Sequence, residues 1–519
     1  MLSTLFVSMH TIVSLVFTDT SRYELLVGSY TKEGNPGIEI FEANINSGKT
    51  SPLYTLKNAN ASYLTVSADG KYMFSVAEEG AAKSSVSSYQ LNEKGVYEFI
   101  NASATIGNGP CFVAYREATK TVYAANYGSG SLSVFKTENG RLGSIAQHIV
   151  YKGSSTNKSR QQAPHAHNVV ISPDQHYLYV VDLGSDKIHQ HKIYADGLVD
   201  EKDNAISITP GNGPRHLTFN PSGTHAYLIN EMGGVVDVFR VDNNQFTLIQ
   251  TLPADTAKAP PHGSADIHIS PSGKWLLTSN RITSNELTVF AIQPDGKLKG
   301  GDHYAVAQKP RNFSFDPSGK FVFVASQDEK RVQVFSFDDR NGRLTDTKQD
   351  ISVSMPVCLI FVKRDVETDA EEQIKKNNIR LIPPTAPIAN YVKYVQVGKM
   401  IYLSGHGPDK PEGGQVLGKL GKDLSLEEGQ AAARLTGISL LSTLRGTIGD
   451  LNKVKRIVKL VALVNSDNSF SQQPMVVNGC SNLLVDVFGD RGRHARTSVG
   501  VNALPNNIAV EIEMIVELK

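Results

Sequence analysis

Cysteine and tryptophan are scarce in this 519-residue chain, which has three cysteines and a single tryptophan, Trp275. The cysteines, Cys111, Cys358 and Cys480, lie far apart, are odd in number and form no CxxC pair. A disulfide framework or a cysteine zinc site is therefore not expected. Low cysteine content is compatible with the cytosol and with a bacterial periplasm, so the sequence allows a cytoplasmic or a periplasmic location.

Neither sign of charge is in excess. Lys and Arg total 52 and Asp and Glu total 51, which gives a formal net charge of +1. This balance argues against a surface that binds nucleic acid, so no nucleic-acid partner is expected. Charged residues make up 20% and hydrophobic residues 40% of the chain, which is typical of globular proteins and excludes a disordered or fibrous chain.

Long hydrophobic runs are also missing. Residues 2–17 are mostly apolar, but a spanning helix needs about 20 apolar residues, so no membrane span is expected. Two interpretations of residues 1–21 stay open: a signal peptide, or an extension ahead of the first domain. Neither Lys nor Arg precedes the apolar run, and no A-x-A cleavage site follows it.

A repeat of 46–50 residues runs through the first 360 residues. Its mark is a Pro-Ser-Gly or Pro-Asp turn followed by an apolar run, and its clearest prolines are Pro173, Pro221, Pro271 and Pro317. Pro/Gly turns between short runs of period two indicate four strands in each unit. A strand-built period of this length predicts a β-propeller. We expect seven blades, the last one combining residues 356–362 with residues 24–54 and so closing the ring.

Ionisable residues gather at one mouth of the predicted channel. The start of the inner strand carries His165, His167, Arg215, His216, Asp266, His268 and Arg311, and the turn after the second strand carries Asp182, Asn230, Glu231, Asn280, Arg281, Gln327 and Asp328. Arginine binds carboxylate or phosphate, and Glu or His can act as a base on water. An arginine or a protonated histidine can stabilise an oxyanion, so the cluster suits a small anionic ester or lactone. The competing interpretation is that the Asp and Asn side chains only cap blade turns.

The same segments resemble a known family. Gly213-Pro-Arg-His-Leu-Thr-Phe, Ile229-Asn-Glu, Ala265-Asp-Ile-His-Ile-Ser-Pro, Ser279-Asn-Arg and Pro164-His-Ala-His-Asn are similar to segments of the bacterial 6-phosphogluconolactonase / carboxy-muconate cyclase family of seven-bladed propellers. The resemblance covers about residues 22–362 and implies a lactonase or lactonising enzyme with no metal and no cofactor. It implies catalytic roles for His165 or His167, Arg215, Glu231 and Arg281. We expect His216, Asp266, His268 and Arg311 to bind the substrate.

A charged segment separates this repeat from a second domain. Residues 363–379 are rich in Lys, Arg, Asp and Glu and indicate a linker or a short surface helix. From residue 380 the pattern predicts a small α+β domain in the order β-β-α-β-α-β-β. A hairpin is expected at residues 392–403, and Ser425-Leu-Glu-Glu indicates a capping box that opens a helix.

The end of the second domain carries its most specific motif. The run from Ala495-Arg496 through Leu504-Pro505 to Glu511 and Glu513 resembles the signature of the RidA/YjgF family of imine deaminases, as do Ala386-Pro-Ile-Ala-Asn-Tyr-Val and Ile401-Tyr-Leu-Ser-Gly. The resemblance covers residues 380–519 and implies a chorismate-mutase-like fold that forms trimers with clefts between subunits. It implies that Arg496 binds the carboxylate of a 2-imino acid, that Glu511 positions the attacking water, and that Tyr391 and Ser404 line the cleft.

This motif departs from the family pattern in three places. His494 replaces a small residue or Pro, Thr497 follows the arginine, and Ser498, which we also expect to contact the ligand, stands where a Cys is frequent. These departures suggest a divergent subfamily. The competing interpretation of Arg496 is a surface ion pair with Glu511 or Glu513.

The leading hypothesis is a propeller lactonase fused to a deaminase-like domain, acting on small anionic substrates as a homo-oligomer, a trimer through the second domain. One alternative is a propeller that binds a ligand without turning it over, and another is a lactonising cyclase. For the second domain the alternatives are ligand binding and ribonuclease activity. The balanced charge and the absence of a basic-aromatic platform in the sequence favour the imine over RNA.

Overall fold

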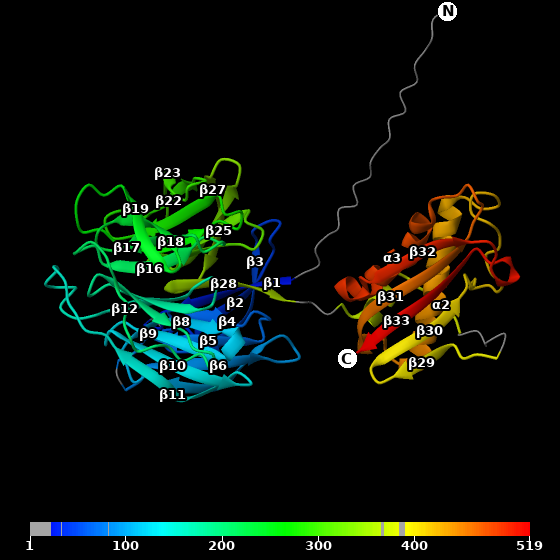
Figure 1. Cartoon of the computed structure of the whole chain (residues 1–519), viewed down its shortest axis with the longest axis horizontal. Coiled ribbons are helices and arrows are strands. Elements are labelled where there is room, and N and C mark those ends of the chain that lie inside the picture. Colours follow the sequence, from blue (N-terminus) through cyan, green and yellow to red (C-terminus); the bar gives the residue numbers. More distant parts are fainter. Residues whose placement is uncertain (1–21, 33, 81, 365–367, 384–389) are drawn as a thin grey trace, which may run out of the picture. The chain divides into compact units, whose positions relative to one another are not determined.

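The computed structural model describes residues 22–519 except 33, 81, 365–367 and 384–389. The apolar stretch before residue 22 and the Ala386-Pro-Ile-Ala segment lie outside the described residues. The chain divides after Arg364 into two compact units (Figure 1). Within the described part of the chain, no helix combines the length and the apolar character needed to cross a bilayer.

The first unit is a β-propeller, as predicted, with seven antiparallel four-stranded sheets among the described residues. Six blades run in sequence order: β4 (Leu64–Val66), β5 (Tyr72–Ala77), β6 (Ser85–Leu91), β7 (Tyr97–Ala104); β8 (Pro110–Arg116), β9 (Thr121–Asn126), β10 (Ser131–Glu138), β11 (Arg141–Val150); β12 (Ala166–Ile171), β13 (Tyr177–Asp182), β14 (Lys187–Lys192), β15 (Ile206–Ser207); β16 (Pro214–Phe219), β17 (His225–Asn230), β18 (Val235–Asp242), β19 (Gln245–Pro253); β20 (Ser264–Ile269), β21 (Trp275–Asn280), β22 (Glu286–Ile292), β23 (Leu298–Ala305); β24 (Pro310–Phe315), β25 (Phe321–Ser326), β26 (Arg331–Asp338), β27 (Arg343–Ser352).

The seventh blade closes the ring from both ends of the unit. Its inner strand is β28 (Pro356–Arg364), and β1 (Arg22–Ser29), β2 (Gly37–Ala43) and β3 (Thr50–Lys57) complete it in the order β28-β1-β2-β3. Arg364 donates to Glu24 at 2.8 Å across this junction, and both side chains are buried. The predicted closure, which leaves the sheet no free inner edge, is thus confirmed.

The propeller core lies between blades rather than within them. Each blade packs apolar side chains against the next; Phe135 of β10, for example, packs with Phe74 and Val76 of β5. The same kind of cluster joins the last repeat to the closing blade, where Phe323 and Val334 meet Val27 and Phe41. Burying both faces of every sheet in this way requires a closed ring, and that ring fixes where the inner strands begin.

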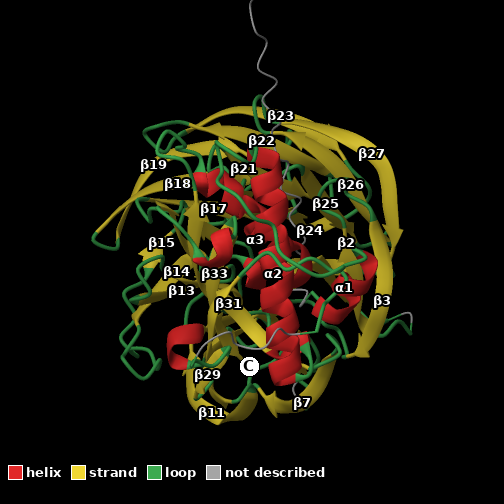
Figure 2. Cartoon of the chain, turned by 90° about the vertical axis from the view of Figure 1, so that its right-hand side faces the viewer, coloured by secondary structure: helices red, strands yellow, loops and turns green. Residues whose placement is uncertain are grey.

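The second unit is the predicted α+β fold. Its elements are α1 (Ala370–Lys376), β29 (Tyr394–Val397), β30 (Met400–His406), α2 (Leu426–Ile448), β31 (Val454–Asn465), α3 (Gln473–Phe488), β32 (Ala495–Val501) and β33 (Val510–Leu518). The sheet order is β29-β30-β33-β31-β32, with β31 and β32 parallel. Helices α2 and α3 pack side by side (Figure 2), and the Ser425 capping box that opens α2 is confirmed.

The charged segment after the propeller is partly helical. Asp369 caps α1 by accepting from the Glu372 N–H, and Ala370 and Ile374 are buried in the core of the second unit. Ordered structure in this unit therefore begins ahead of residue 380.

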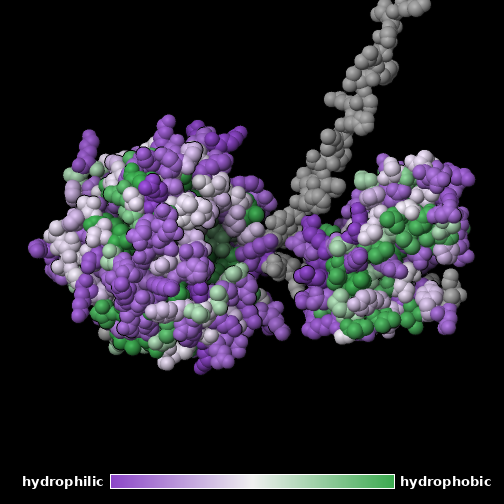
Figure 3. All heavy atoms as spheres, viewed as in Figure 1, coloured by the Kyte–Doolittle hydropathy of each residue, from purple (hydrophilic) through white to green (hydrophobic). Residues whose placement is uncertain are grey.

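One face of the second sheet carries exposed apolar side chains that the described residues of its own unit do not cover. Ile401, Leu460 and Ile512 point to the helices and are buried, whereas Val395, Tyr402 and Val499 alternate to the opposite face and are exposed. Figure 3 shows hydrophobic residues at the surface of this unit. An apolar sheet face of this kind is typical of an interface.

Candidate functional site

A β-bulge opens the inner strand of five sequential blades. The register with the second strand skips one residue after Pro110, Ala166, Pro214 and Pro310, and two residues after Ser264. Bulges re-aim side chains next to active sites. The skipped residues include Cys111, His167, Arg215, Asp266 and Arg311. All of these except Cys111 were expected from the sequence to belong to the site.

Three of these side chains line a pocket of about 320 Å³ at this mouth of the channel. It is lined by Tyr30, Glu78, Cys111, Tyr127, Arg160, His167, Glu231, Arg281, Ile282 and Arg311. Of the residues expected from the sequence, the pocket therefore brings together His167, Glu231, Arg281 and Arg311. Arg215 lies directly behind it, in contact with Glu231.

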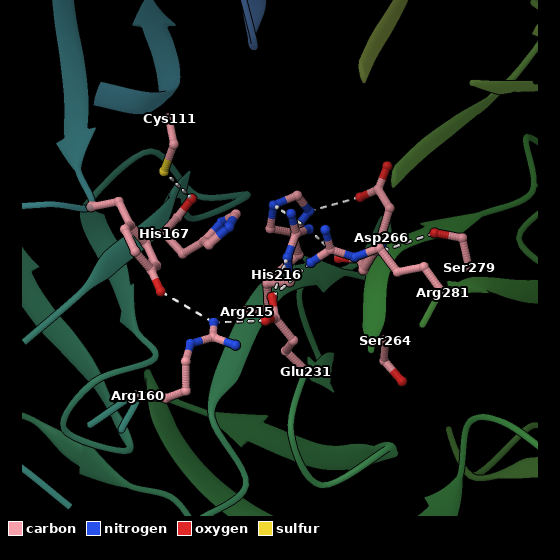
Figure 4. A network of polar contacts seen from close by, with 12 residues as sticks. Cys111, Arg160, His167, Arg215, His216, Glu231, Ser264, Asp266, Ser279 and Arg281 are labelled. Atoms are coloured by element: carbon pink, nitrogen blue, oxygen red, sulfur yellow. Dashed lines mark hydrogen bonds and ion pairs between the residues drawn. The ribbon is translucent and has the colours of Figure 1, made fainter. Parts of the chain in front are cut away.

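Glu231 binds three arginines, two that line the pocket and Arg215 behind it (Figure 4). Its Oε1 accepts from Arg160 Nη2 at 2.8 Å, and its Oε2 accepts from Arg215 Nε at 3.0 Å and from Arg281 Nη2 at 2.9 Å. Burial alone would raise the pKa of Glu231, but the three guanidinium groups lower it to about 2. Glu231 is consequently ionised at neutral pH, is a weak base, and organises the arginines.

His167 and Arg311 differ from Glu231 in having no polar partner among the described residues. The His167 side chain is buried, and its Nδ1 accepts and donates no hydrogen bond. Burial, followed by Arg215 and His216, holds the pKa of His167 well below 6.5, so the imidazole is neutral at pH 7. The Arg311 guanidinium faces the Tyr30 ring at 5.5 Å. A neutral imidazole thus lies in the same pocket as a guanidinium that forms no direct ion pair among the described residues, although the Glu78 and Glu231 carboxylates of the pocket act on its charge from a distance.

Behind the pocket, His216, Asp266 and His268 form a buried chain. His216 Nδ1 lies 2.7 Å from Asp266 Oδ1, and its Nε2 lies 3.2 Å from Arg215 Nη1. The other oxygen of Asp266 contacts His268 Nε2 at 2.8 Å. Burial and Arg215 lower the pKa of His216 to about 4, so a neutral His216 donates to Asp266 and accepts from Arg215. None of the three lines the pocket; they hold Arg215 in place.

His165 also lies outside the pocket lining. Its Nδ1 donates to the Tyr127 carbonyl at 2.9 Å, and its ring stacks on Tyr127 with centroids 4.5 Å apart. Its backbone N–H donates to Asp182, which caps the turn after β13. The sequence left His165 and His167 as alternatives, and only His167 reaches the pocket.

Structural contacts account for several of the other polar residues. Asn230, at the end of β17, donates to the Val235 carbonyl across the following turn at 3.3 Å. Asn280, at the end of β21, donates to the Ala254 carbonyl of the preceding blade at 2.6 Å, and Asp328 pairs with Lys309. The interpretation that Asp and Asn only cap turns describes Asp182 and Asn230, whereas it does not describe Glu231.

Sequence reasoning missed four residues of the pocket for one reason and Arg160 for another; it also missed the apolar Ile282, which directly follows Arg281. Tyr30, Glu78 and Tyr127 directly follow the second strand of their blades, as Glu231 and Arg281 do, and Cys111 occupies the same bulge as His167. Reading these two positions in all seven blades would have found them. Arg160 lies in a loop between blades that has no counterpart in the repeat.

The stability of the propeller is expected to fall in mild acid because of Glu231. Its folded pKa, about 2, lies below the ordinary value of 4.5, so ionised Glu231 stabilises the fold above pH 4.5, and this contribution of about 3 kcal/mol is lost as pH falls toward 2. Trp275, the only tryptophan of the chain, reports propeller unfolding by fluorescence in urea. Between pH 5 and 3, the free energy of unfolding should depend less steeply on pH in Glu231→Gln than in the wild type. The same pH dependence in both proteins would contradict the ion-pair network.

The second unit holds a larger pocket of about 810 Å³. Its lining includes Tyr391, Ser404 and Glu511 from the expected set, together with Arg380 and Lys393. Burial raises the pKa of Glu511, and Glu513 adds to this shift. A Cβ at Gly405 would lie 2.0 Å from Glu511 Oε1, so glycine leaves the room that this carboxylate occupies.

Arg496 does not reach this pocket. Its guanidinium donates to Asn478, Ser481 and the Pro474 carbonyl of α3 at 3.0–3.2 Å, and not to Glu511 or Glu513. Arg496 pairs in register with buried Leu460 and so faces the helices, whereas Glu511 alternates to the open face of the sheet. Within one chain, Arg496 and Glu511 therefore lie on opposite faces, separated by strand β31 and offset by three positions along the strands. Ser498 Oγ is buried without a partner in the described structure.

Among the described residues, no group of His, Cys, Asp or Glu is placed to hold a metal ion.

Known proteins match each unit separately. Residues 24–361 match the family of seven-bladed β-propeller lactonases, and residues 373–518 match the YjgF/chorismate mutase-like family. A 6-phosphogluconolactonase of Formosa agariphila is 33% identical over 341 residues, 64% of this chain and 97% of that protein. The periplasmic gluconolactonase of Pseudomonas aeruginosa, whose structure is solved, is 32% identical with a TM-score of 0.63, and the match covers 66% of this chain and 99% of that chain.

Protein TCP17 of Trypanosoma cruzi is 45% identical over 146 residues, which are 28% of this chain and 91% of that protein. The matches to the two units do not overlap, in agreement with two compact units that meet at residue 364. The chain belongs to the seven-bladed β-propeller lactonase family, with a YjgF/chorismate mutase-like domain fused after the propeller.

Proposed function

We propose that the propeller hydrolyses a sugar lactone of the 6-phosphogluconolactonase type. The observation that carries this proposal is the neutral His167 imidazole beside Arg311, both without a polar partner among the described residues. A base and a guanidinium whose hydrogen-bond donors are not used by a carboxylate, both in one pocket, suit attack of water on an ester carbonyl.

The reaction follows from these groups. His167 takes a proton from water as its oxygen bonds to the lactone carbonyl carbon, and Arg281 and Arg311 stabilise the oxyanion that forms. The intermediate collapses by breaking the ring C–O bond, and the leaving alkoxide takes the proton back from His167. The product is the open-chain hydroxy acid. Glu231 keeps the three arginines together without giving up its charge.

Hydrolysis is tested by following acid release in a pH-stat. We expect the purified full-length protein to hydrolyse glucono-δ-lactone, its 6-phosphate, or both above the spontaneous rate, with kcat in the range of about 1–1000 s⁻¹. Heat-denatured protein gives the blank. No turnover of either lactone, with ligand binding at the same pocket, would favour the non-catalytic propeller instead.

For the second unit we propose deamination of a 2-imino acid. The partly buried Glu511 carboxylate, with a raised pKa, lines a pocket together with Tyr391 and Ser404, and such a carboxylate suits positioning of the attacking water. Arg496, the candidate partner of the substrate carboxylate, faces the other side of the sheet in the same chain. The site is incomplete without a second copy, so we propose a trimer that covers the open apolar face of the sheet.

A further inference from the structure

Arg160 reaches the pocket from a loop, unlike the other arginines that bind Glu231. The loop between β11 and β12 spans residues 151–165 and carries no strand. The Arg160 side chain is 41% exposed, compared with 2% for Arg215 and 12% for Arg281. It thus lies at the rim of the pocket, where an entering substrate meets it first.

The loop holds Arg160 in a fixed position. Gln161 is fully buried and donates to the Leu183 carbonyl at 2.9 Å. Its Oε1 accepts from the Asn157 N–H, and the Asn157 side chain in turn accepts from the Arg160 N–H at 3.1 Å. A backbone tied down on both sides of Arg160 preorganises the long side chain, which lowers the entropy lost on binding a ligand.

The Arg160 guanidinium uses only one of its three nitrogens inside the protein. Nη2 donates to Glu231 Oε1 at 2.8 Å and to the Tyr127 hydroxyl at 3.2 Å. Nε and Nη1 have no partner among the described residues, so three N–H donors stay available. His165, stacked on Tyr127, keeps this tyrosine under the arginine.

The charge balance of the site leaves room for an anion. Among the residues that line the pocket, Arg160, Arg281 and Arg311 supply three positive charges, and Glu78 and Glu231 supply two negative ones, so the lining carries a net charge of +1. Hydrolysis of a neutral lactone passes through a single negative charge, which Arg281 and Arg311 stabilise. The unused N–H donors of Arg160 at the rim are not needed for that charge and match a second anionic group on the substrate.

We propose that Arg160 is the specificity-determining residue of this site and that its free N–H groups bind a phosphate monoester on the lactone, away from the reacting carbonyl. The inference rests on the proposed lactonase function. It assigns the deep end of the pocket, with His167 and Arg281, to the carbonyl and the rim to the phosphate. Because the phosphate is far from the reacting atoms, Arg160 acts mainly on substrate binding.

The test compares two lactones that differ only in the phosphate, glucono-δ-lactone and its 6-phosphate. In Arg160→Gln, the ratio of kcat/KM for the phosphorylated to the neutral lactone should fall at least about 10-fold, mostly through KM, and Arg160→Lys should restore part of it. Any general damage from the weakened Glu231 contact cancels in the ratio. Lys158→Gln removes a charge from the same loop and should leave the ratio unchanged. An unchanged ratio in Arg160→Gln overturns the proposal.

Calorimetric binding of the product separates this inference from the proposed function. Titrations use 6-phosphogluconate and gluconate, with the wild-type chain and with Arg160→Gln. If neither lactone is hydrolysed but 6-phosphogluconate binds more tightly than gluconate only while Arg160 is present, the catalytic proposal fails and the specificity role stands. If the wild type and Arg160→Gln prefer the phosphate equally, the specificity role fails whatever the turnover.

Discussion

Replacing His167 with asparagine is expected to lower kcat for lactone hydrolysis by at least about 100-fold while KM changes by only a few-fold. Asparagine keeps a polar group in the pocket but cannot take a proton from water, and Arg281 and Arg311 still bind the substrate. Because burial and neighbouring cations hold the pKa of His167 well below 6.5, wild-type kcat/KM should be independent of pH near neutrality and should fall only below pH 6.5, as the imidazole becomes protonated.

His165 provides a matched control, since it lies two residues away on the same strand start. It contacts the Tyr127 carbonyl and ring rather than the pocket, so His165→Asn should cost much less in kcat, below about 10-fold. Two results would show that His167 is not the base. One is a similar loss of kcat in both variants. The other is a kcat/KM that still falls below pH 6.5 in His167→Asn as it does in the wild type. Trp275 fluorescence in urea checks that each variant remains folded.

The repeat made most of the propeller predictable. Period-two alternation and the spacing of Pro173, Pro221, Pro271 and Pro317 require stacked four-stranded units. The ring must then close, which pairs β28 with β1 although more than 300 residues separate them. The second domain was predictable for a similar reason, because its helices are amphipathic and Ser425 starts one with a capping box.

The site was predictable by position but not by role. Residue type and blade position placed Arg215, Glu231, Arg281 and Arg311 around one mouth of the channel. The bulge that turns His167 inward, while His165 stays outside, depends on the hydrogen-bond register, which the amino-acid pattern does not encode. The ion pairs of three arginines with the Glu231 carboxylate also form only in the folded ring, because Arg160, Arg215 and Arg281 come from distant segments. Because these ion pairs keep Glu231 ionised and weakly basic, Glu231 organises the arginines and is no longer a candidate for the catalytic base.

Mixed assemblies test the site of the second unit, and a large recovery of activity is expected. Arg496→Ala and Glu511→Gln should each abolish imine deamination, measured as ammonia release from a freshly generated 2-imino acid. If Arg496 of one chain completes the pocket of Glu511 in another, co-expression of the two variants produces sites with both wild-type residues. Random assembly of equal amounts gives an intact pair in about one quarter of the sites of a cyclic trimer, so about one quarter of wild-type activity should return.

The recovery distinguishes a shared site from a site within one chain. Arg496 and Glu511 lie on opposite faces of the same sheet, so a single chain would need a rearranged sheet to use both on one substrate. No recovery in a co-expressed sample shown by tagged pull-down to contain both variants would contradict the shared site. The reference mixture is the wild type co-expressed with a double variant that carries Arg496→Ala and Glu511→Gln in one chain. A shared site in this mixture is intact only when both contributing chains are wild type, so about one quarter of the sites should again be active. Equal activities in the two mixtures are the result that only a site built from two copies produces.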